Sequence, residues 1–483
     1  MTSKPQQQST EDQPGASSLG PALAAIGLGG AALLASRAIA GPLTPPGGPV
    51  SSTHKTLLQV EPRTALTQEN TPGDATAVLV ITQPGSYYLT GNVSVPANKS
   101  GIRVAATDVS IDLNGFTISA NDAAGTTGIT DSGAGMANVS ICNGVIERTA
   151  NYGVFLIGQP TRLSRLTLRG HGKLGALLGT RARLDRVLAF GNGAAGGLSG
   201  GIYASGEAAF IGCVATQNTG VGLTVGAFAV VRGCLALQNT GNGIAMGFGG
   251  IASNCESTAN AIGFECQAAS VLHHCVAQQN RAAGFQTSWA AAVSQCTANN
   301  NAAEGFLHHE GCALVECTTS GNTGPGIKCG QGVLVTRSTA SFGGVVGIDL
   351  TTSPGSLVSD CVARNNGNSG IAVSGQTLVR GNNCVANAVN GPAAAGIYAI
   401  GGSNRIEDNH CAPGAGYGIW VNAQRNMVVN NTCGLNNLNY SISSNCIYGP
   451  VVNRTGLSVS GMSGNGTVAT TMGTTDPFAN IAF

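Results

Sequence analysis

CVATQNTGVGLTVGAFAVVRG, residues 213–233, is followed directly by CLALQNTGNGIAMGFGGIASN, residues 234–254, and the two stretches align without a gap. Each begins with a cysteine, has an asparagine five residues later, and then has a glycine followed by a large apolar residue. The cysteine recurs at steps of 20 or 21 residues: Cys213, Cys234, Cys255, Cys275, Cys296 and Cys317. A fixed period of this length predicts a solenoid, in which each coil buries its apolar side chains by stacking on its neighbours.

Apolar and polar residues alternate within each coil, and a period of two is typical of β-strands. We expect Cys213 and Ala215 to point inward. After the next turn, Leu223 and Val225 are expected to point inward and Thr224 outward. The asparagine lies at a turn, and asparagines stacked in register are expected to hydrogen-bond from coil to coil. The inward row after the glycine continues outside the regular repeats in these residues: Val154, Ile202, Ile348, Ile371, Ile397 and Ile419.

Two other classes of solenoid do not fit this repeat. The L-x-x-L-x-L-x-x-N pattern of leucine-rich repeats is missing, and left-handed hexapeptide helices need coils that are multiples of six residues. We therefore predict an all-β chain that forms a right-handed parallel β-helix, with about 21–23 residues per coil. Counting residues extends the cysteine row backwards and forwards through these positions: Cys142, Arg165, Arg186, Ser338, Cys361, Cys384, Cys411 and Cys433.

The composition narrows the class of protein. Of the 483 residues 72 are glycine, only 9% are charged and 5% are aromatic, which suits a turn-rich β solenoid and argues against a helical array. The net charge is +1 and no basic cluster with interleaved aromatics occurs, so nucleic acid is not an expected partner. We predict one long solenoid over residues 76–434, followed by a C-terminal cap over residues 435–483 that interrupts the period.

Residues 1–40 are predicted to form a signal or export segment. The apolar run of residues 21–35 is too short and too rich in glycine for a stable membrane span, and it is followed by Ala38-Ile39-Ala40, which matches the A-x-A pattern of signal peptidase sites. The acidic Glu11 and Asp12 depart from the usual positive start, so an uncleaved anchor or a disordered tail is the alternative. The segment predicts a secreted, cell-surface or periplasmic protein.

Residues 41–75 are predicted to form a linker and an N-terminal cap, because they begin with the Pro/Gly-rich stretch GPLTPPGGPV of residues 41–50.

The segment VSIDLNGFTIS, residues 109–119, together with the cysteine ladder, resembles the pectin-lyase-like superfamily of right-handed parallel β-helices. More narrowly, residues 41–50, 60–95 and 475–483 are similar to secreted planctomycete-type β-helix proteins of unknown function. The resemblance covers nearly the whole chain and is specific for the fold. In this superfamily, uronate lyases hold calcium on clustered aspartates, and mannuronan epimerases have an acidic, histidine-rich site. The resemblance therefore implies a site of one of these two kinds if the chain is an enzyme. This sequence has no D-x-D or comparable acidic cluster, so no cofactor is expected.

The 15 cysteines are expected to pack as a ladder of buried thiols. Equivalent cysteines on adjacent coils lie about 4.8 Å apart, but parallel side chains in register lack the crossed geometry that a disulfide prefers. Cysteine also packs well as a small apolar residue. One or two disulfides, or a metal site, are the alternatives, although no C-x-x-C motif occurs. The cysteines off the ladder are the places for such exceptions: Cys266, Cys312, Cys329 and Cys446.

We expect function on an outward strand face, where consecutive coils present one column of side chains. The outward position two residues after each glycine forms such a column: Phe155, Tyr203, Thr224, Ala245, Glu265, Gln286, Leu307, Lys328, Asp349, Ala372, Tyr398 and Trp420. The rise of one coil is similar to the length of one sugar residue, so a polysaccharide laid along the axis meets each coil in turn. The predicted binding residues are Tyr203, Glu265, Gln286, Trp289, Lys328, Asp349, Tyr398 and Trp420. An ordinary solvated strand face is the alternative.

Catalysis has a weaker basis in the sequence. A lyase-like site would use His309 as proton acceptor, with Glu304 or Glu310 as the group that orients it. Alternation places His308 inward and His309 outward, and a loop without function is the alternative. Glycoside hydrolysis by paired carboxylates is not expected, because Glu265 and Asp349 stand four coils, or about 19 Å, apart. No metal site is predicted.

The sequence thus predicts an exported β-helix protein that binds extracellular or cell-surface polysaccharide, or that has a structural role in the envelope. The second hypothesis is a polysaccharide lyase or epimerase that acts on an acidic glycan along the outward strand face.

Overall fold

The computed structural model describes residues 61–133, 136–193, 198–391, 394–453, 459–460, 468–469 and 476–483. All the described residues lie within one compact unit, Leu57–Phe483. The predicted export segment and the Pro/Gly-rich stretch after it lie outside the described residues. All elements in the described ranges are β-strands. No helix in these ranges is long and apolar enough to cross a membrane.

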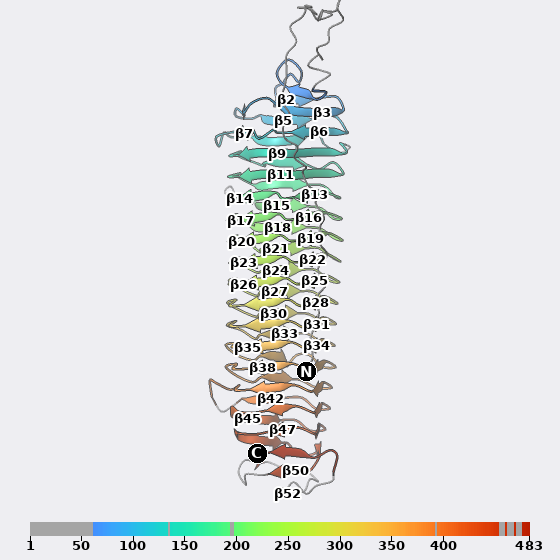
Figure 1. Ribbon diagram of the computed structural model, residues 1–483, viewed down its shortest axis with the longest axis vertical. Coiled ribbons are helices and arrows are strands. Elements are labelled where there is room, and N and C mark those ends of the chain that lie inside the picture. Colours follow the sequence, from blue (N-terminus) through green and yellow to red (C-terminus); the bar gives the residue numbers. More distant parts are fainter. Residues whose placement is uncertain are drawn as a thin grey trace, which may run out of the picture. The chain divides into compact units, whose positions relative to one another are not determined.

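Each regular coil of this unit contains three short strands. In one coil β18 (Val221–Val225) is followed by β19 (Val230–Arg232) and β20 (Leu235–Leu237), and the next coil begins with β21 (Ile244–Met246). Strands β18, β19 and β20 each pair in parallel with the equivalent strands of the coils before and after them. The chain is therefore a right-handed parallel β-helix of about 17 turns, which confirms the predicted fold class. Figure 1 shows these coils stacked from β2 to β50.

Three parallel sheets run along the solenoid. Sheet B takes the first strand of each coil: β2 (Ala77–Ile81), β5 (Ser100–Val104), β8 (Thr127–Asp131), β10 (Val154–Leu156), β12 (Leu174–Leu178), β15 (Gly200–Ala204), β18, β21, β24 (Phe264–Cys266), β27 (Phe285–Thr287), β30 (Phe306–His308), β33 (Ile327–Cys329), β36 (Ile348–Leu350), β39 (Ile371–Val373), β42 (Ala395–Ala399), β45 (Gly414–Val421), β48 (Asn436–Ile442) and β51 (Val459–Ser460).

Sheet A1 takes the second strand of each coil: β1 (Thr64–Leu66), β3 (Gly85–Leu89), β6 (Val109–Asp112), β13 (Arg183–Asp185), β16 (Ala209–Ile211), β19, β22 (Ile251–Ser253), β25 (Val271–His273), β28 (Ala292–Ser294), β31 (Ala313–Val315), β34 (Leu334–Thr336), β37 (Leu357–Ser359), β40 (Leu378–Arg380), β43 (Arg405–Glu407), β46 (Met427–Val429) and β49 (Ile447–Tyr448). The long strands β9 (Val139–Glu147) and β11 (Thr161–Arg169) belong to both A sheets.

Sheet A2 takes the third strand: β4 (Val93–Ser94), β7 (Thr117–Ser119), β14 (Leu188–Phe190), β17 (Val214–Thr216), β20, β23 (Glu256–Thr258), β26 (Val276–Gln278), β29 (Thr297–Asn299), β32 (Thr318–Ser320), β35 (Thr339–Ser341), β38 (Val362–Arg364), β41 (Asn383–Val385), β44 (His410–Cys411), β47 (Thr432–Cys433), β50 (Val451–Asn453), β52 (Val468–Ala469) and β53 (Asn480–Ala482). The bend from A1 to A2 needs a left-handed residue, and Gly212 and Gly233 provide it in two coils with φ of 59°.

The interior is filled by the residues that alternation predicted. Cys213, Ala215, Leu223 and Val225 are buried, and Thr224 on the outer face is half-buried. The predicted inward row after the glycine is buried throughout. Three phenylalanines of this row stack face to face with ring centroids 4.8 Å apart, which is also the spacing of neighbouring strands: Phe264, Phe285 and Phe306.

The predicted asparagine ladder is also present. The side chain of Asn239 donates to the carbonyl of Ala215 at 3.0 Å and to Asn260 Oδ1 at 2.9 Å, and its own Oδ1 accepts from the backbone N–H of Asn218 at 3.1 Å. Each amide thus binds backbone groups of the preceding coil and the amide of the next coil. His171 takes the same position at one end of the ladder, where its backbone N–H donates to Asn192 Oδ1 at 3.0 Å.

The extension of the cysteine row was partly wrong. The strand register places the buried Val187 and Leu166 in the row of Cys213, whereas Arg165 and Arg186 lie one residue earlier, at the left-handed bend, with their side chains outside. Cys142 pairs with Ser164, two residues before Leu166, so it does not belong to the row either. Ser338 and Cys361 do continue the row. Beyond them the row continues in Asn382, Asn409, Asn431 and Asn480, and Cys384, Cys411 and Cys433 belong to the row of Ala363 instead.

All 15 cysteines lie in the described ranges, and all are free. Fourteen are buried, including the four off-ladder cysteines, and Cys142 is half-buried. Along the ladder, the Cys213 backbone N–H donates to Cys234 Sγ at 3.4 Å. Burial raises the pKa of Cys317 and of Cys361 to about 12. The thiols therefore act as interior packing groups.

Parallel strand pairing is also present outside residues 76–434. Strand β1 already pairs in parallel with β3, and β48 pairs with β45 after residue 434. The last strand, β53, returns to lie between β47 and β50 and pairs in parallel with both. This insertion pairs the backbone of the final coils, whereas the exact extent of the N-terminal and C-terminal caps stays a prediction.

Candidate functional site

The outward column of sheet B has the register that the repeat predicted. Tyr203 is paired with Thr224, Thr224 with Ala245, and Ala245 with Glu265. The same register leads through Gln286 and Leu307 to Lys328 and Asp349, and then through Ala372 to Tyr398 and Trp420. One additional member, Leu177, lies between Phe155 and Tyr203. The predicted residues of the column therefore lie along one face, with adjacent members about 4.8 Å apart at Cα.

A pocket of about 230 Å³ interrupts this face where two small residues follow each other. Thr224 and Ala245 are part of its lining, and Tyr203 and Glu265, one coil before and one coil after them, line it as well. The backbone of Gly226 and Gly247 borders the same pocket. The pocket exists because short side chains on two successive coils leave room between larger ones.

The carboxylate of Glu265 is held in place in this pocket. Asn242, on the preceding coil, donates from Nδ2 to Glu265 Oε2 at 2.5 Å. This contact leaves the other oxygen, Oε1, for hydrogen bonds to a ligand. No lysine or arginine lines the pocket, so it has a negative charge.

The far end of the column carries a group of stacked aromatic rings. Tyr398 and Trp420, on successive coils, stack with centroids 4.5 Å apart, and Tyr417 stacks on Trp420 at 4.7 Å. All three are half-buried, so one side of each ring system faces solvent. Such rings offer apolar surface on an otherwise polar face.

The middle of the column is occupied by charges that already have partners. Lys328 Nζ lies 3.7 Å from Glu304 Oε1, and the two partly neutralise each other. Asp349 Oδ1 accepts from the Thr351 backbone N–H at 3.0 Å and from its hydroxyl at 2.7 Å, which closes the turn after β36. The half-buried Gln286 is the neutral polar member next to Glu265.

Strand β30 separates Glu304 from the other two residues proposed for catalysis, His309 and Glu310. Glu304 precedes this strand, and His309 and Glu310 follow it on an exposed turn. Five residues of extended chain span roughly 16 Å, so the partnership of Glu304 with His309 has no support in this arrangement. His308 points inward and His309 outward, as alternation predicted. The described residues also contain no group of three or more His, Cys, Asp or Glu side chains that could hold a metal ion.

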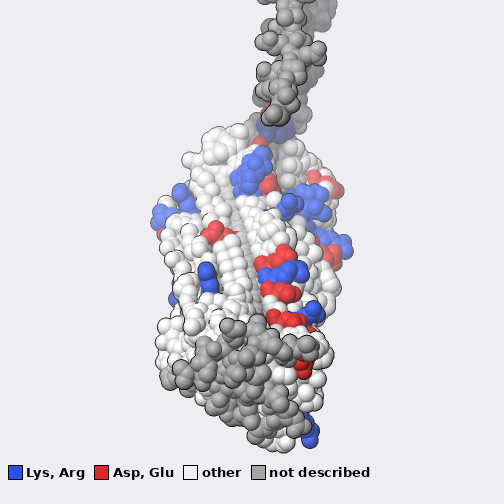
Figure 2. Space-filling view, turned by 60° about the horizontal axis from the view of Figure 1, so that its bottom comes forward, with Lys and Arg blue, Asp and Glu red and all other residues white. Residues whose placement is uncertain are grey.

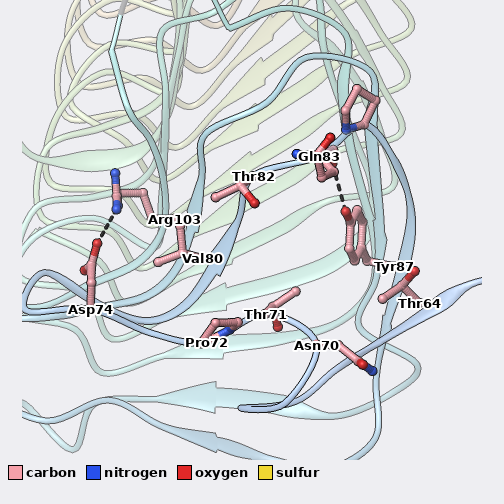
Figure 3. A pocket seen from close by; sticks show the side chains of 11 residues that line it. Thr64, Asn70, Thr71, Pro72, Asp74, Val80, Thr82, Gln83, Tyr87 and Arg103 are labelled. Atoms are coloured by element: carbon pink, nitrogen blue, oxygen red, sulfur yellow. Dashed lines mark hydrogen bonds and ion pairs between the residues drawn. The ribbon is translucent and has the colours of Figure 1, made fainter.

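A second pocket, of about 520 Å³, lies at the N-terminal coils and contains none of the predicted residues (Figure 3). Arg103 forms an ion pair with Asp74 across it, and Tyr87 donates to the carbonyl of Gln83 at 2.8 Å. Hydrogen bonds from the backbone N–H of Thr76 lower the pKa of Asp74 to about 2. The two charges in this pocket therefore cancel.

Sequence reasoning missed two exposed aromatic residues beside Trp289. Phe228, Phe248 and Trp289 lie on the turns that lead from sheet B to sheet A1, and they are 63%, 50% and 64% exposed. The Phe228 and Phe248 rings meet edge to face with centroids 5.6 Å apart. The repeat contains a sign of this exposure, because Phe228 occupies a left-handed turn position at which the next coil has Gly249.

Comparisons with known proteins agree with the fold. A family model described as the right handed beta helix region matches residues 286–433 and 330–474. No curated protein matches the chain in sequence. Several solved structures are similar to this chain in fold at low sequence identity. This similarity does not indicate what the chain binds, and the resemblance to planctomycete-type proteins stays a prediction.

Three of these solved structures are enzymes that their names associate with alginate or mannuronic acid. They are the A-module of the mannuronan C-5 epimerase AlgE6 of Azotobacter vinelandii (13% identity, 82% of this chain and 89% of that chain, TM-score 0.27), the periplasmic alginate epimerase AlgG (11%, 75% and 80%, TM-score 0.33), and a mannuronic acid specific polysaccharide family 6 lyase from human gut microbiota (10%, 73% and 82%, TM-score 0.27).

Proposed function

Because this chain is a right-handed parallel β-helix, in which equivalent side chains repeat along one axis, we propose that it is an exported protein that binds a polysaccharide along the outer face of sheet B. The observation that supports this most is the pocket between Tyr203 and Glu265. Three coil spacings, or about 14 Å, separate these two residues at Cα, which suits a short run of sugar residues. The Tyr203 ring offers apolar surface to a sugar ring, and the carboxylate of Glu265 accepts hydrogen bonds from hydroxyl groups.

The charges favour a neutral glycan over an acidic one. The pocket contains the carboxylate of Glu265 and no basic residue, and Lys328, farther along the column, is already paired with Glu304. A uronate polymer would bring like charges together in this pocket, which costs binding free energy. The aromatic group at Tyr398 and Trp420 adds a second contact for an uncharged sugar face.

Binding agrees with the geometry better than catalysis does. Glu265 and Asp349 are four coils apart, about 19 Å at Cα, and glycosidases need carboxyl groups within about 10 Å of each other. Asp349 is also engaged by Thr351. The lyase or epimerase hypothesis, with His309, Glu304 and Glu310, remains the second candidate and is tested in the same experiment.

The test is a screen of neutral and acidic polysaccharides, followed by calorimetry on any that bind. We expect a neutral glycan to bind, and Tyr203→Ala and Glu265→Gln each to weaken it about tenfold, the effect of about 1.4 kcal/mol from one good contact. The matched control is Glu256→Gln, an exposed glutamate on sheet A2, which should leave the affinity unchanged.

Absence of binding to every glycan, or equal losses in Glu265→Gln and Glu256→Gln, would contradict the proposal. An acidic polymer that is cleaved or epimerised, with activity lost in His309→Ala, would favour the second candidate.

A further inference from the structure

Sheet A1 carries an uncharged apolar row on its outer surface. The first residues of nine successive A1 strands are paired with one another from Ala209 in β16 to Leu378 in β40, and they are Ala, Val, Ile, Val, Ala, Ala, Leu, Leu and Leu in order. All nine are exposed or half-buried, with Val230, Ile251 and Val271 at about 40% exposure or more. We call these nine residues the apolar stripe.

The exposed aromatic residues extend this surface at its edge. Phe228 precedes Val230 by two residues, Phe248 precedes Ile251 by three, and Trp289 precedes Ala292 by three. Phe228 has a φ of 57°, a conformation that is unfavourable for a bulky side chain, and its ring is nevertheless mostly exposed. The same turn position is left-handed at Glu207 and Ala269, so this conformation belongs to the coil, and the observation that bears on a contact is the exposure of the bulky ring.

Charged residues of the same row occur only at its two ends. Arg183 in β13 precedes the stripe, and Arg405 in β43, which is paired with Glu407 at 2.5 Å, follows it. In the neighbouring outward row of sheet A1, Arg232 is the one charge beside Val230 and Ile251. On the face that Figure 2 views, Lys, Arg, Asp and Glu gather in clusters beside broad uncharged areas. An apolar, aromatic centre with charges at the rim is the composition of a protein interface.

We propose that a second copy of this chain covers the apolar stripe, so that the protein is a dimer through sheet A1. The stripe spans eight coil spacings, about 38 Å, and a width of about 15 Å gives on the order of 600 Å² per partner, close to the roughly 800 Å² of a standard interface. A partner that interdigitates over this length must repeat its side chains about every 4.8 Å. A second β-helix of this chain has that spacing and the same uncharged row, whereas a helical or irregular partner does not.

A symmetric dimer brings the stripe against itself, because a two-fold interface uses the same patch on both copies. Ala292 is the fifth of the nine residues, so it lies near its own counterpart whether the two solenoids run parallel or antiparallel. The proposed glycan face belongs to sheet B and remains free in such a dimer. The dimer is therefore independent of the proposed function.

The experiment is a measurement of mass in solution for the full chain, by sedimentation or light scattering over a range of concentrations. We expect a dimer, and we expect Val230→Lys together with Ile251→Lys to weaken it on the order of a hundredfold, because four lysines would be buried without partners. The control is Val389→Lys, which changes a still more exposed valine elsewhere in the chain, at 64% exposure, and should leave the dimer intact.

A second variant does not depend on the lysine variant being stable. Ala292→Cys adds an exposed thiol to a chain whose own cysteines are buried or half-buried, and mild oxidation should then join two chains, whereas Val389→Cys and the unchanged protein should stay mostly unlinked. A monomer at every concentration, or a dimer unaffected by the lysines and without the Ala292→Cys link, would overturn the proposal.

Discussion

His308 lies inside the solenoid, as the alternation within the strand predicted. The predicted proton acceptor is its outward neighbour, His309, and His308 cannot take that role. Its Nδ1 shares a hydrogen bond of 2.5 Å with the hydroxyl of Thr287, and its ring stacks near Phe306. Burial lowers the pKa of His308 to about 3, and the same cause lowers that of His171 to about 3. Both rings are therefore neutral in the folded protein over most of the accessible pH range.

These two histidines make stability sensitive to acid. The unfolded chain binds a proton at each histidine near the ordinary pKa of 6.5, whereas the folded chain binds it only near 3. The free energy of unfolding should therefore fall by about 1.4 kcal/mol per pH unit and histidine as the pH decreases from 6.5 towards 3. In His308→Leu we expect a slope that is shallower by about 1.4 kcal/mol per pH unit, measured by urea unfolding between pH 6 and 4.

The control is His410→Leu, which removes an exposed histidine and should keep the slope of the unchanged protein. Parallel curves for His308→Leu and the unchanged protein would show that His308 is not held neutral by its surroundings. The comparison of slopes is unaffected by any constant loss of packing in the variant.

At the scale of the element, the asparagine ladder connects the coils at the turn before sheet B. The side chain of Asn239 makes four hydrogen bonds, to Ala215, Asn260 and the backbone and side chain of Asn218. Its side chain is fully buried, so no water replaces these bonds when the amide is removed. The ladder thus joins the turns of successive coils, as backbone hydrogen bonds join their strands.

We expect Asn239→Ala to destabilise the solenoid by roughly 3–5 kcal/mol, because several buried backbone and amide groups lose their partners. Asn383→Ala, in the exposed part of β41, should change the unfolding free energy by less than about 0.5 kcal/mol. Urea unfolding of both variants measures the difference. Similar losses in the two would mean that the ladder adds no more than an exposed asparagine does.

At the scale of the whole molecule, the thiols report on the integrity of the entire solenoid. They are distributed from Cys142 to Cys446, and all but Cys142 are buried. Reaction with a thiol reagent needs both access and the thiolate, and burial removes access while it raises the pKa of residues such as Cys317 and Cys361.

We expect an aromatic disulfide reagent at pH 8 to modify no more than one thiol of the folded protein and all 15 after unfolding in denaturant. Cys142→Ser should reduce the rapid reaction of the folded protein to none. Several rapidly reacting thiols without denaturant would contradict the buried ladder, and fewer than 15 after denaturation would reveal disulfides.

The amino-acid sequence by itself determined the coil and its inner rows, because the period of about 21 residues and the alternation within strands are local patterns. The inward positions of Cys213, Leu223 and His308, and the column from Tyr203 to Trp420, follow from counting within regular repeats. Counting was wrong where the coil is irregular. The observed row is displaced from the predicted one by one residue at Arg186 and by two residues at Cys384. A count of residues does not show at which turn a coil gains or loses a residue.

The tertiary structure alone decided which residues of the column line one pocket. It brought Tyr203 and Glu265 to one pocket through the small Thr224 and Ala245, and it separated Glu304 from His309 by the length of a strand. It also showed the exposed Phe228 and Phe248 beside the apolar stripe. These outcomes depend on the volumes and directions of side chains on neighbouring coils, which no single repeat contains.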